Sequence, residues 1–209
     1  MRKLLMEFIG TFFFILTIAI GAGPIAVSSM LMAWLYIGFY VSGGHFNPMV
    51  TLAVMLTEGI TLVHAGYYML AQIAGGFLAY AAAAYLHTRV VFPEPNASVS
   101  LAQAFIVEIL LAFVFASVVL HVAMTKRFHA STVFGFAIGF TIPALMAFGG
   151  PISGGLFNPA ISIGSTLFGA ISGMSEIMWS HLGMYVIGAF LGGALAAYAF
   201  IYFVPERSR

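Results

Sequence analysis

The chain consists of long apolar stretches separated by short polar breaks. Six of these stretches are long enough to cross the hydrocarbon core of a bilayer as helices, at 4–21, 25–41, 62–86, 101–124, 131–149 and 179–203. Two shorter apolar stretches, 47–57 and 158–168, cannot cross it. They predict re-entrant half-helices, which occur at membrane depth only when buried in protein or lining water. The pattern therefore predicts an all-α membrane protein with six transmembrane helices and two half-helices.

Nearly the same sequence motif leads into both short stretches. Residues 42–48 read SGGHFNP and residues 153–159 read SGGLFNP, 111 positions later (from 42 to 153). Three full spans separate the two copies of this motif, and three is an odd number. The second copy therefore enters the membrane from the opposite face, which makes an inverted repeat with its pseudo-two-fold axis in the membrane plane.

Other residues repeat in the same order. Glu7 in the first span corresponds to Glu108 in the fourth, and we pair Gly75-x-x-x-Ala79 in the third span with Gly188-x-x-x-Gly192 in the sixth. We therefore expect a single transmembrane channel domain over 1–209, with a first repeat at 1–88 and a second repeat at 100–205. The polar segment 89–100 joins them.

Composition agrees with a chain that faces lipid. Hydrophobic residues make up 62% and charged residues 6%, against about 25% charged in a soluble domain. The absence of cysteine excludes disulfides and thiolate metal sites, and the histidine spacing matches no metal site. A net charge of +1 gives no indication of nucleic-acid binding. We expect no cofactor, no metal and no nucleic-acid partner.

The positive charges predict the orientation. With six spans, one side holds Arg2, Lys3, Lys126, Arg127, Arg207 and Arg209, and the other holds Arg89. Lys and Arg gather in the cytoplasm, so both termini are expected there. The short loops and small size favour a prokaryotic inner membrane. The first stretch also has features of a cleaved signal peptide, but Glu7 interrupts it and has a partner in the second repeat.

Each Asn-Pro pair is a helix start. Asn is a preferred N-cap, and Pro is favoured at the first helical position. The inversion brings the starts at Asn47-Pro48 and Asn158-Pro159 together near the bilayer centre. Each helix start carries about +0.5 of an elementary charge, so the two helix starts together repel cations and orient a dipolar solute. The two Asn side chains can offer N–H groups to a passing oxygen, and the carbonyls of 42–46 and 153–157 can act as acceptors.

These residues carry a resemblance to a known family. SGGHFNPMVT and SGGLFNPA closely resemble the two signature motifs of the aquaporin and glycerol-facilitator family, and MEFIGTFF, the paired glutamates and the six spans follow the family's order. The resemblance implies a passive channel for water or small uncharged solutes, assembled as a homotetramer with one pore per subunit. Met49 stands where the family usually has Ala, whereas the second copy keeps Ala160. We expect the bulk of Met49 to point toward the opposite half-helix or into the pore.

The sequence departs from the family at the outer constriction. The resemblance implies an arginine after the second Asn-Pro-Ala, and this chain has Ile161 there. The other constriction positions that it implies are Val27, Met146 and Gly155. All four residues lack a side-chain hydrogen-bonding group, so we expect an apolar constriction and weaker selectivity for water.

Three polar residues have more than one interpretation. Glu7 and Glu108 lie within spans, where a carboxylate is costly, and are candidates for a proton relay, for supporting the loops through their backbone N–H groups, or for reaching the membrane interface. The resemblance favours loop support. His45 either faces the inner vestibule or packs within the protein.

Other function classes fit less well. A coupled secondary transporter also uses inverted repeats and broken helices, but needs an ionisable group on the path. A wider apolar pore for glycerol-like solutes or dissolved gases remains an alternative. The chain has no HExxH motif and no Asp, which argues against an enzyme.

Overall fold

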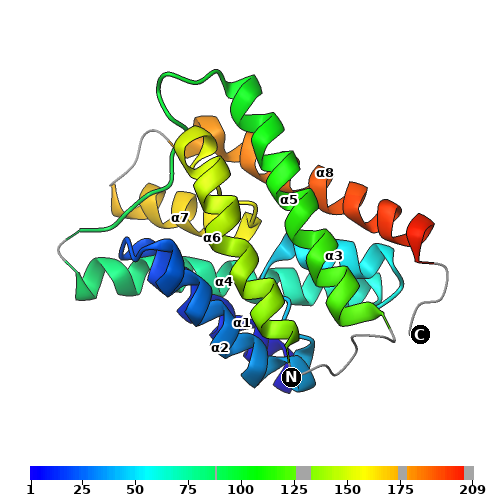
Figure 1. Cartoon of the computed structure of the whole chain (residues 1–209). Helices are drawn as coiled ribbons and strands as arrows, with labels where there is room; N and C mark the ends of the chain where they lie inside the picture. The colour runs from blue at the N-terminus through cyan, green and yellow to red at the C-terminus, as the bar shows by residue number, and fades with distance from the viewer. Residues whose placement is uncertain (88, 126–132, 174–177, 205–209) are drawn as a thin grey trace.

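The computed structural model of the chain describes residues 1–87, 89–125, 133–173 and 178–204. Its helices are α1 (Arg2–Ala19), α2 (Pro24–Ser42), α3 (Pro48–Leu56), α4 (Leu62–Leu86), α5 (Leu101–Met124), α6 (Phe134–Ser153), α7 (Pro159–Ser172) and α8 (Met178–Phe203) (Figure 1). The fold is thus all-helical, with the two short helices α3 and α7 at the predicted places.

Five helices, α2, α4, α5, α6 and α8, are long and apolar enough to cross a membrane. The sixth long helix, α1, has 18 residues and carries Arg2, Lys3 and Glu7. It packs along α4 and α2 within the bundle. The first stretch is therefore an integral part of the fold, as the repeat partner of Glu7 indicated.

Two predicted boundaries differ from the structure. Helix α6 continues beyond residue 149 to Ser153, although Pro151 lies in its last turn. The segment before α5 holds this end, because Asn96 donates its backbone N–H to the Ile152 carbonyl and its side-chain amide to the Pro151 carbonyl. Helix α7 continues beyond 168 to Ser172 and is followed by Gly173, which has the positive φ of a helix C-cap. The predicted start at 131 and the predicted repeat end at 205 lie outside the described residues.

The helix contacts follow the inverted repeat. Helix α1 packs on α4 as α5 packs on α8, and α1 packs on α2 as α5 packs on α6. Each half-helix packs on the last helix of the other repeat, α3 on α8 and α7 on α4. We call the side that holds the N-terminus the terminal side, and the side that holds segment 89–100 the loop side (Figure 1).

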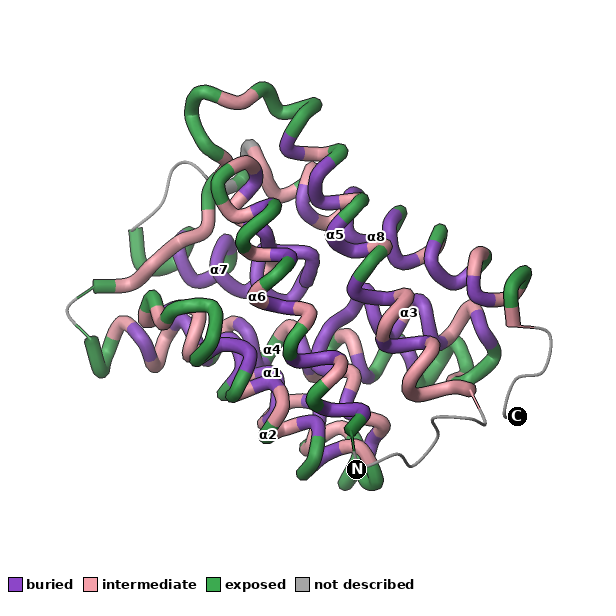
Figure 2. Tube along the Cα trace, viewed as in Figure 1, coloured by how far each residue is buried: buried purple, intermediate pink, exposed green. Residues whose placement is uncertain are grey.

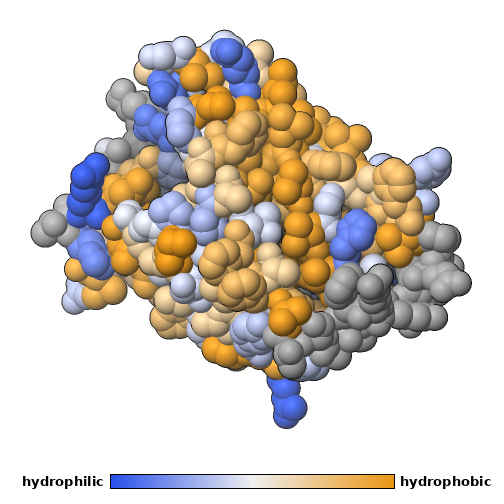
Figure 3. Space-filling view, viewed as in Figure 1, coloured by the Kyte–Doolittle hydropathy of each residue, from blue (hydrophilic) through white to orange (hydrophobic). Residues whose placement is uncertain are grey.

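The outside of the bundle is apolar. Large hydrophobic side chains such as Leu70, Phe136 and Leu195 are exposed, and apolar residues cover much of the face in Figure 3. Buried positions concentrate on the sides of the helices that face the centre (Figure 2). This distribution suits a protein solvated by lipid, where the interior rather than the exterior holds the polar groups.

The contact between α2 and α6 satisfies a backbone group that the sequence itself exposes. Pro143 has no N–H, so it cannot donate to the Gly139 carbonyl four residues earlier. The Ser28 hydroxyl of α2 donates to that carbonyl at 2.8 Å. Ser28 and Gly139 are equivalent in the repeat, 111 positions apart, so this bond lies between matching points of the two halves.

The small residues of α4 and α8 correct one sequence interpretation. A Cβ built on Gly75 would meet backbone atoms of α1, and one built on Gly192 would meet the equivalent atoms of α5. Gly75 therefore corresponds to Gly192, and the predicted pairing with Gly188 is wrong by one helical turn. Small residues recur every four positions in this part of α8, so spacing alone could not fix the register.

The Ser28 bond gives a first prediction. Ser28→Ala leaves the Gly139 carbonyl without its donor, and should lower the free energy of unfolding by about 1 kcal/mol, the usual size of an interhelical hydrogen bond in a membrane protein. Thermal unfolding in detergent measures this change. The matched control is Ser29→Ala, because the Ser29 hydroxyl bonds only its own helix, at Ile25. Equal losses for both variants would contradict the proposed role of Ser28.

Candidate functional site

Each half-helix begins at its asparagine. The Asn47 side-chain oxygen accepts from the Met49 N–H, and the Asn158 side-chain oxygen accepts from the Ala160 N–H, both at 2.9 Å. Pro48 and Pro159 occupy the first helical positions. The residues before the two asparagines, Phe46 and Phe157, have positive φ angles of 48° and 32°. The same sequence motif thus builds the same turn twice.

The two turns hold each other through reciprocal hydrogen bonds. The Asn47 amide nitrogen donates to the Phe157 carbonyl at 3.0 Å, and the Asn158 amide nitrogen donates to the Phe46 carbonyl at 3.1 Å. Both asparagines are almost fully buried, at 3% and 2% exposure. The N-termini of α3 and α7 therefore meet at one place in the interior. An amide nitrogen carries two hydrogens, so each bond uses one of them.

A buried carboxylate accepts hydrogen bonds from the backbone of each turn. The two oxygens of Glu7 accept from the His45 and Phe46 N–H groups at 3.0 and 2.7 Å, and a hydroxyl, that of Ser42, adds a third bond at 2.6 Å. Glu108 binds Leu156, Phe157 and Ser153 at the same three distances.

Both carboxylates are 0% exposed, so neither reaches the membrane interface. Their oxygens are occupied by the turns, which is the geometry that loop support requires.

The support differs in one residue. Glu7 also accepts from the Gln72 side chain at 2.8 Å, and Gln72 in turn lies 2.9 Å from the Thr51 hydroxyl. By the register of α4 and α8, the position equivalent to Gln72 is Ala189. The first turn is therefore held by a larger polar network than the second.

Two tyrosines fix the backbone where the turns leave α2 and α6. The Tyr68 hydroxyl donates to the Ser42 carbonyl, and the Tyr185 hydroxyl donates to the Ser153 carbonyl. Sequence reasoning did not identify Tyr68, Tyr185 or Gln72. The pairing of Tyr68 with Tyr185 would have been visible if α4 and α8 had been aligned in the correct register.

Met49 makes a contact with α8 that the sequence did not suggest. Its side chain is fully buried and packs against Gly193 of α8, where an added Cβ would lie 2.7 Å from the Met49 Cγ. At the equivalent contact, Gly76 of α4 packs directly on the Ala160 backbone. The larger residue therefore fills space between α3 and α8, and it does not line either of the two cavities described next.

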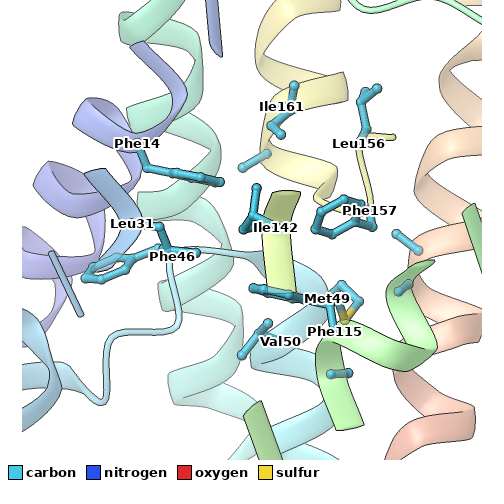
Figure 4. Packing of buried hydrophobic residues seen from close by; sticks show 14 of the residues in the cluster. Phe14, Leu31, Phe46, Met49, Val50, Phe115, Ile142, Leu156, Phe157 and Ile161 are labelled. Atoms are coloured by element: carbon cyan, nitrogen blue, oxygen red, sulfur yellow. The ribbon is translucent and has the colours of Figure 1, made fainter. Parts of the chain in front are cut away.

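A cavity of about 530 Å³ opens on the loop side of the turns. Its lining includes all four predicted constriction residues, Val27, Met146, Gly155 and Ile161. Phe14, Ile142 and Phe157 also line it, and Figure 4 shows them near Ile161. Arg89 and Glu94 of the connecting segment are the charged residues in its wall. The floor beside the turns is therefore apolar and the rim is charged.

A second cavity, of about 10 Å³, lies on the terminal side of the turns. It is lined by Leu35, Phe39, His45, Val50 and Phe115, among others. The His45 ring nitrogen Nδ1 lies 3.1 Å from the Thr51 hydroxyl, and its ring packs near Tyr68. His45 thus both lines this cavity and packs within the protein, so the two alternatives for it are not exclusive.

In the ranges that the structure describes, no cluster of three His, Cys, Asp or Glu side chains could hold a metal ion. The polar groups of the site are backbone amides and carbonyls, two asparagine amides, hydroxyls and two carboxylates that are already bound. This arrangement can bind and orient a small dipolar molecule.

An inverted repeat of helices with two half-helices meeting at an internal asparagine pair is the architecture of a membrane transport protein. Comparisons with known proteins give the family. The major intrinsic protein family model matches residues 1–202. The glycerol uptake facilitator protein-like 6 of Lactiplantibacillus plantarum is 34% identical over 95% of this chain and 96% of its own. The probable aquaporin TIP3-2 of Arabidopsis thaliana is 35% identical over 78% of this chain and 60% of its own.

A solved structure has the same fold. The aquaglyceroporin from Plasmodium falciparum aligns with a TM-score of 0.79 over 98% of this chain and 95% of its own, at 18% identity. The chain belongs to the major intrinsic protein family. It is an integral membrane protein and a passive channel for water or small solutes, not an enzyme.

The Glu108 contacts lead to a second prediction. Glu108→Gln replaces one acceptor oxygen by a donor that faces backbone N–H groups, so the second turn should loosen and the unfolding free energy should fall by about 3 kcal/mol. Thermal unfolding and osmotic water flux should both decrease. The exposed Glu94→Gln is the control for a lost carboxylate. An unchanged stability of Glu108→Gln would show that the carboxylate does not hold the turn.

The contact between Met49 and Gly193 leads to a third prediction. Gly193→Ala places a methyl group against Met49 and should lower the unfolding temperature, and Met49→Ala should lower it by leaving a cavity. The double variant should lose less than the sum, because the alanines fill the space left by the methionine. Additive losses in this double-mutant cycle would mean that Met49 does not pack on Gly193.

Proposed function

We propose that each subunit conducts water and small uncharged solutes through a pore that passes the paired turns. The observation that carries this proposal is the reciprocal binding of Asn47 and Asn158 between two cavities on opposite sides of the turns. The second amide hydrogen of each asparagine would bind the solute oxygen. The carbonyls of 43–45 and 154–156, for which we find no donor among the described residues, would continue the path.

Ion exclusion would come from the same place. The starts of α3 and α7 bring two partial positive charges together, which disfavours a cation at the centre of the pore. The loop-side constriction would add no charge, because Val27, Met146, Gly155 and Ile161 are uncharged. Cation exclusion would therefore depend on the half-helices and asparagines alone, and the loop-side constriction by itself would discriminate weakly between water and solutes such as glycerol or dissolved gases.

Coupled transport receives no support from the site. Its candidate ionisable residues, Glu7 and Glu108, are fully buried and bound to the turns. Neither lines either of the two cavities.

The assembly and orientation are also proposals. We infer a homotetramer, from the family resemblance, with both termini in the cytoplasm of a prokaryotic cell. Arg2 and Lys3 lie on the terminal side and Arg89 on the loop side, which supports this orientation. Lys126, Arg127, Arg207 and Arg209, which also favour it, lie outside the described residues. Native mass spectrometry would give the oligomer, and accessibility of a C-terminal tag would give the orientation.

Osmotic swelling of proteoliposomes tests the channel. Stopped-flow light scattering should show water flux well above that of empty vesicles, with a low activation energy, and flux of glycerol, urea or ammonia would identify the solutes. Flux no greater than that of empty vesicles would contradict the proposal. A proton flux comparable to that of a proton channel, measured under a pH gradient, would contradict ion exclusion by the half-helices.

Substitution of Ile161 gives a fourth prediction. Ile161→Arg adds a charge and hydrogen-bond donors to the loop-side cavity, so the pore should become narrower and more selective for water over glycerol. The ratio of water to glycerol permeability measures this effect. Ile161→Met, of similar size and without charge, is the control. An unchanged ratio in Ile161→Arg would mean that this residue does not line the path.

A further inference from the structure

The two cavities are related by the inverted repeat. Of the eleven residues that line the terminal-side cavity, ten have an equivalent in the lining of the loop-side cavity. The offset is 111 residues for α2, α6 and the turns, and 101 for α1 and α5, as from Glu7 to Glu108. The pairs include Ile138 with Val27, Leu35 with Met146, and Val50 with Ile161. The structure thus contains two rings of side chains, one on each side of the asparagines.

Phe39 is the eleventh residue. It lies in the last full turn of α2, and its equivalent in α6 is Gly150. The local geometry confirms this equivalence, because the Gly43 N–H donates to the Phe39 carbonyl as the Gly154 N–H donates to the Gly150 carbonyl. A Cβ built on Gly150 would meet nothing within 4 Å. The side chain that lines the terminal-side cavity is therefore missing at the matching place on the loop side.

The Phe39 ring is held where it lies. Its centroid is 4.3 Å from that of Phe134 and 5.5 Å from that of Tyr40. Phe134 is buried at the start of α6, so the contact joins the two helices that face each other across the pseudo-two-fold axis. A ring packed in this way has few alternative positions, and its volume remains beside the path.

Among the described residues, the two cavities also differ in volume. The loop-side cavity measures about 530 Å³ and includes part of segment 89–94 in its wall, whereas the terminal-side cavity measures about 10 Å³. A space of that size holds about one water molecule. Glycerol has six heavy atoms and needs more room. The four loop-side positions that are expected to form the filter therefore face the roomier of the two cavities.

We propose that Phe39 and the other side chains around the terminal-side cavity form the size-limiting constriction of the pore, so that solutes are selected by size on the terminal side. This inference rests on the proposed channel function. Because the lining there is apolar apart from His45 and the backbone of Gly43 and Gly44, passage favours molecules that fit one at a time, such as water, over polyols. A change in Ile161 or Val27 that widens the loop side then has little effect on solute size.

Exchange of the two equivalent residues tests the proposal. Phe39→Ala opens the terminal side and should raise glycerol permeability severalfold relative to the wild type. Gly150→Phe adds a ring where space is open and should lower water and glycerol permeability together. Ile161→Ala makes the corresponding truncation on the loop side and should raise glycerol permeability less than Phe39→Ala does. All are measured by stopped-flow light scattering on proteoliposomes with equal amounts of folded protein.

The outcomes separate the claims. A rise in glycerol flux with Ile161→Ala and none with Phe39→Ala would overturn the proposal and place the size limit on the loop side. Phe39→Leu, which keeps an apolar contact with Phe134, repeats the test if Phe39→Ala does not fold, and should give a smaller rise. If folded wild type and all variants conduct no water or solute, the proposed channel function itself fails, and this inference with it.

Discussion

The structure depends on two hydrogen bonds that cross between its halves. Asn47 donates to the carbonyl before Asn158, and Asn158 donates to the carbonyl before Asn47. Neither half-helix crosses the membrane, so each buried start needs a partner inside the protein that fixes its position. The other turn is that partner. The same bonds bring two helix starts to one point, which creates the positive centre that a neutral, dipolar solute passes and a cation avoids.

The remaining polar groups serve this joint. Glu7 and Glu108 bind the turns from behind, and Tyr68 and Tyr185 fix the carbonyls where the turns leave α2 and α6. These groups satisfy backbone atoms that would otherwise be costly at membrane depth. The two turns are held in nearly the same way, so the selectivity for solutes depends on the residues that differ between the two repeats. Met49 fills the space between α3 and α8, and Phe39 narrows the terminal side of the path.

Much of this could be predicted from the sequence, because the determinants are local. Asn and Pro are favoured at a helix start, the motif occurs twice with matching flanks, and the length of an apolar stretch decides whether it spans a bilayer, so α3 and α7 were expected where they lie. Val27, Met146, Gly155 and Ile161 line one cavity, at the constriction positions that the family resemblance implied, with Val27 and Met146 placed by counting along unbroken helices. The direction of Met49, the match of Gly75 with Gly192 and the role of Gln72 could not be predicted, because each depends on the register between helices that are distant in sequence. The contrast of Phe39 with Gly150 became visible only when the two cavities were compared.

The most direct test of the central claim is a double-mutant cycle on the two asparagines. The unfolding free energies of Asn47→Ala, Asn158→Ala and the double variant would be measured in detergent against the wild type. The loss of a helix cap is local to each turn and adds. The loss of a shared joint does not add, so the double variant should lose clearly less stability than the sum of the single variants. Losses that add within error would mean that the two turns are held independently, and would contradict the account.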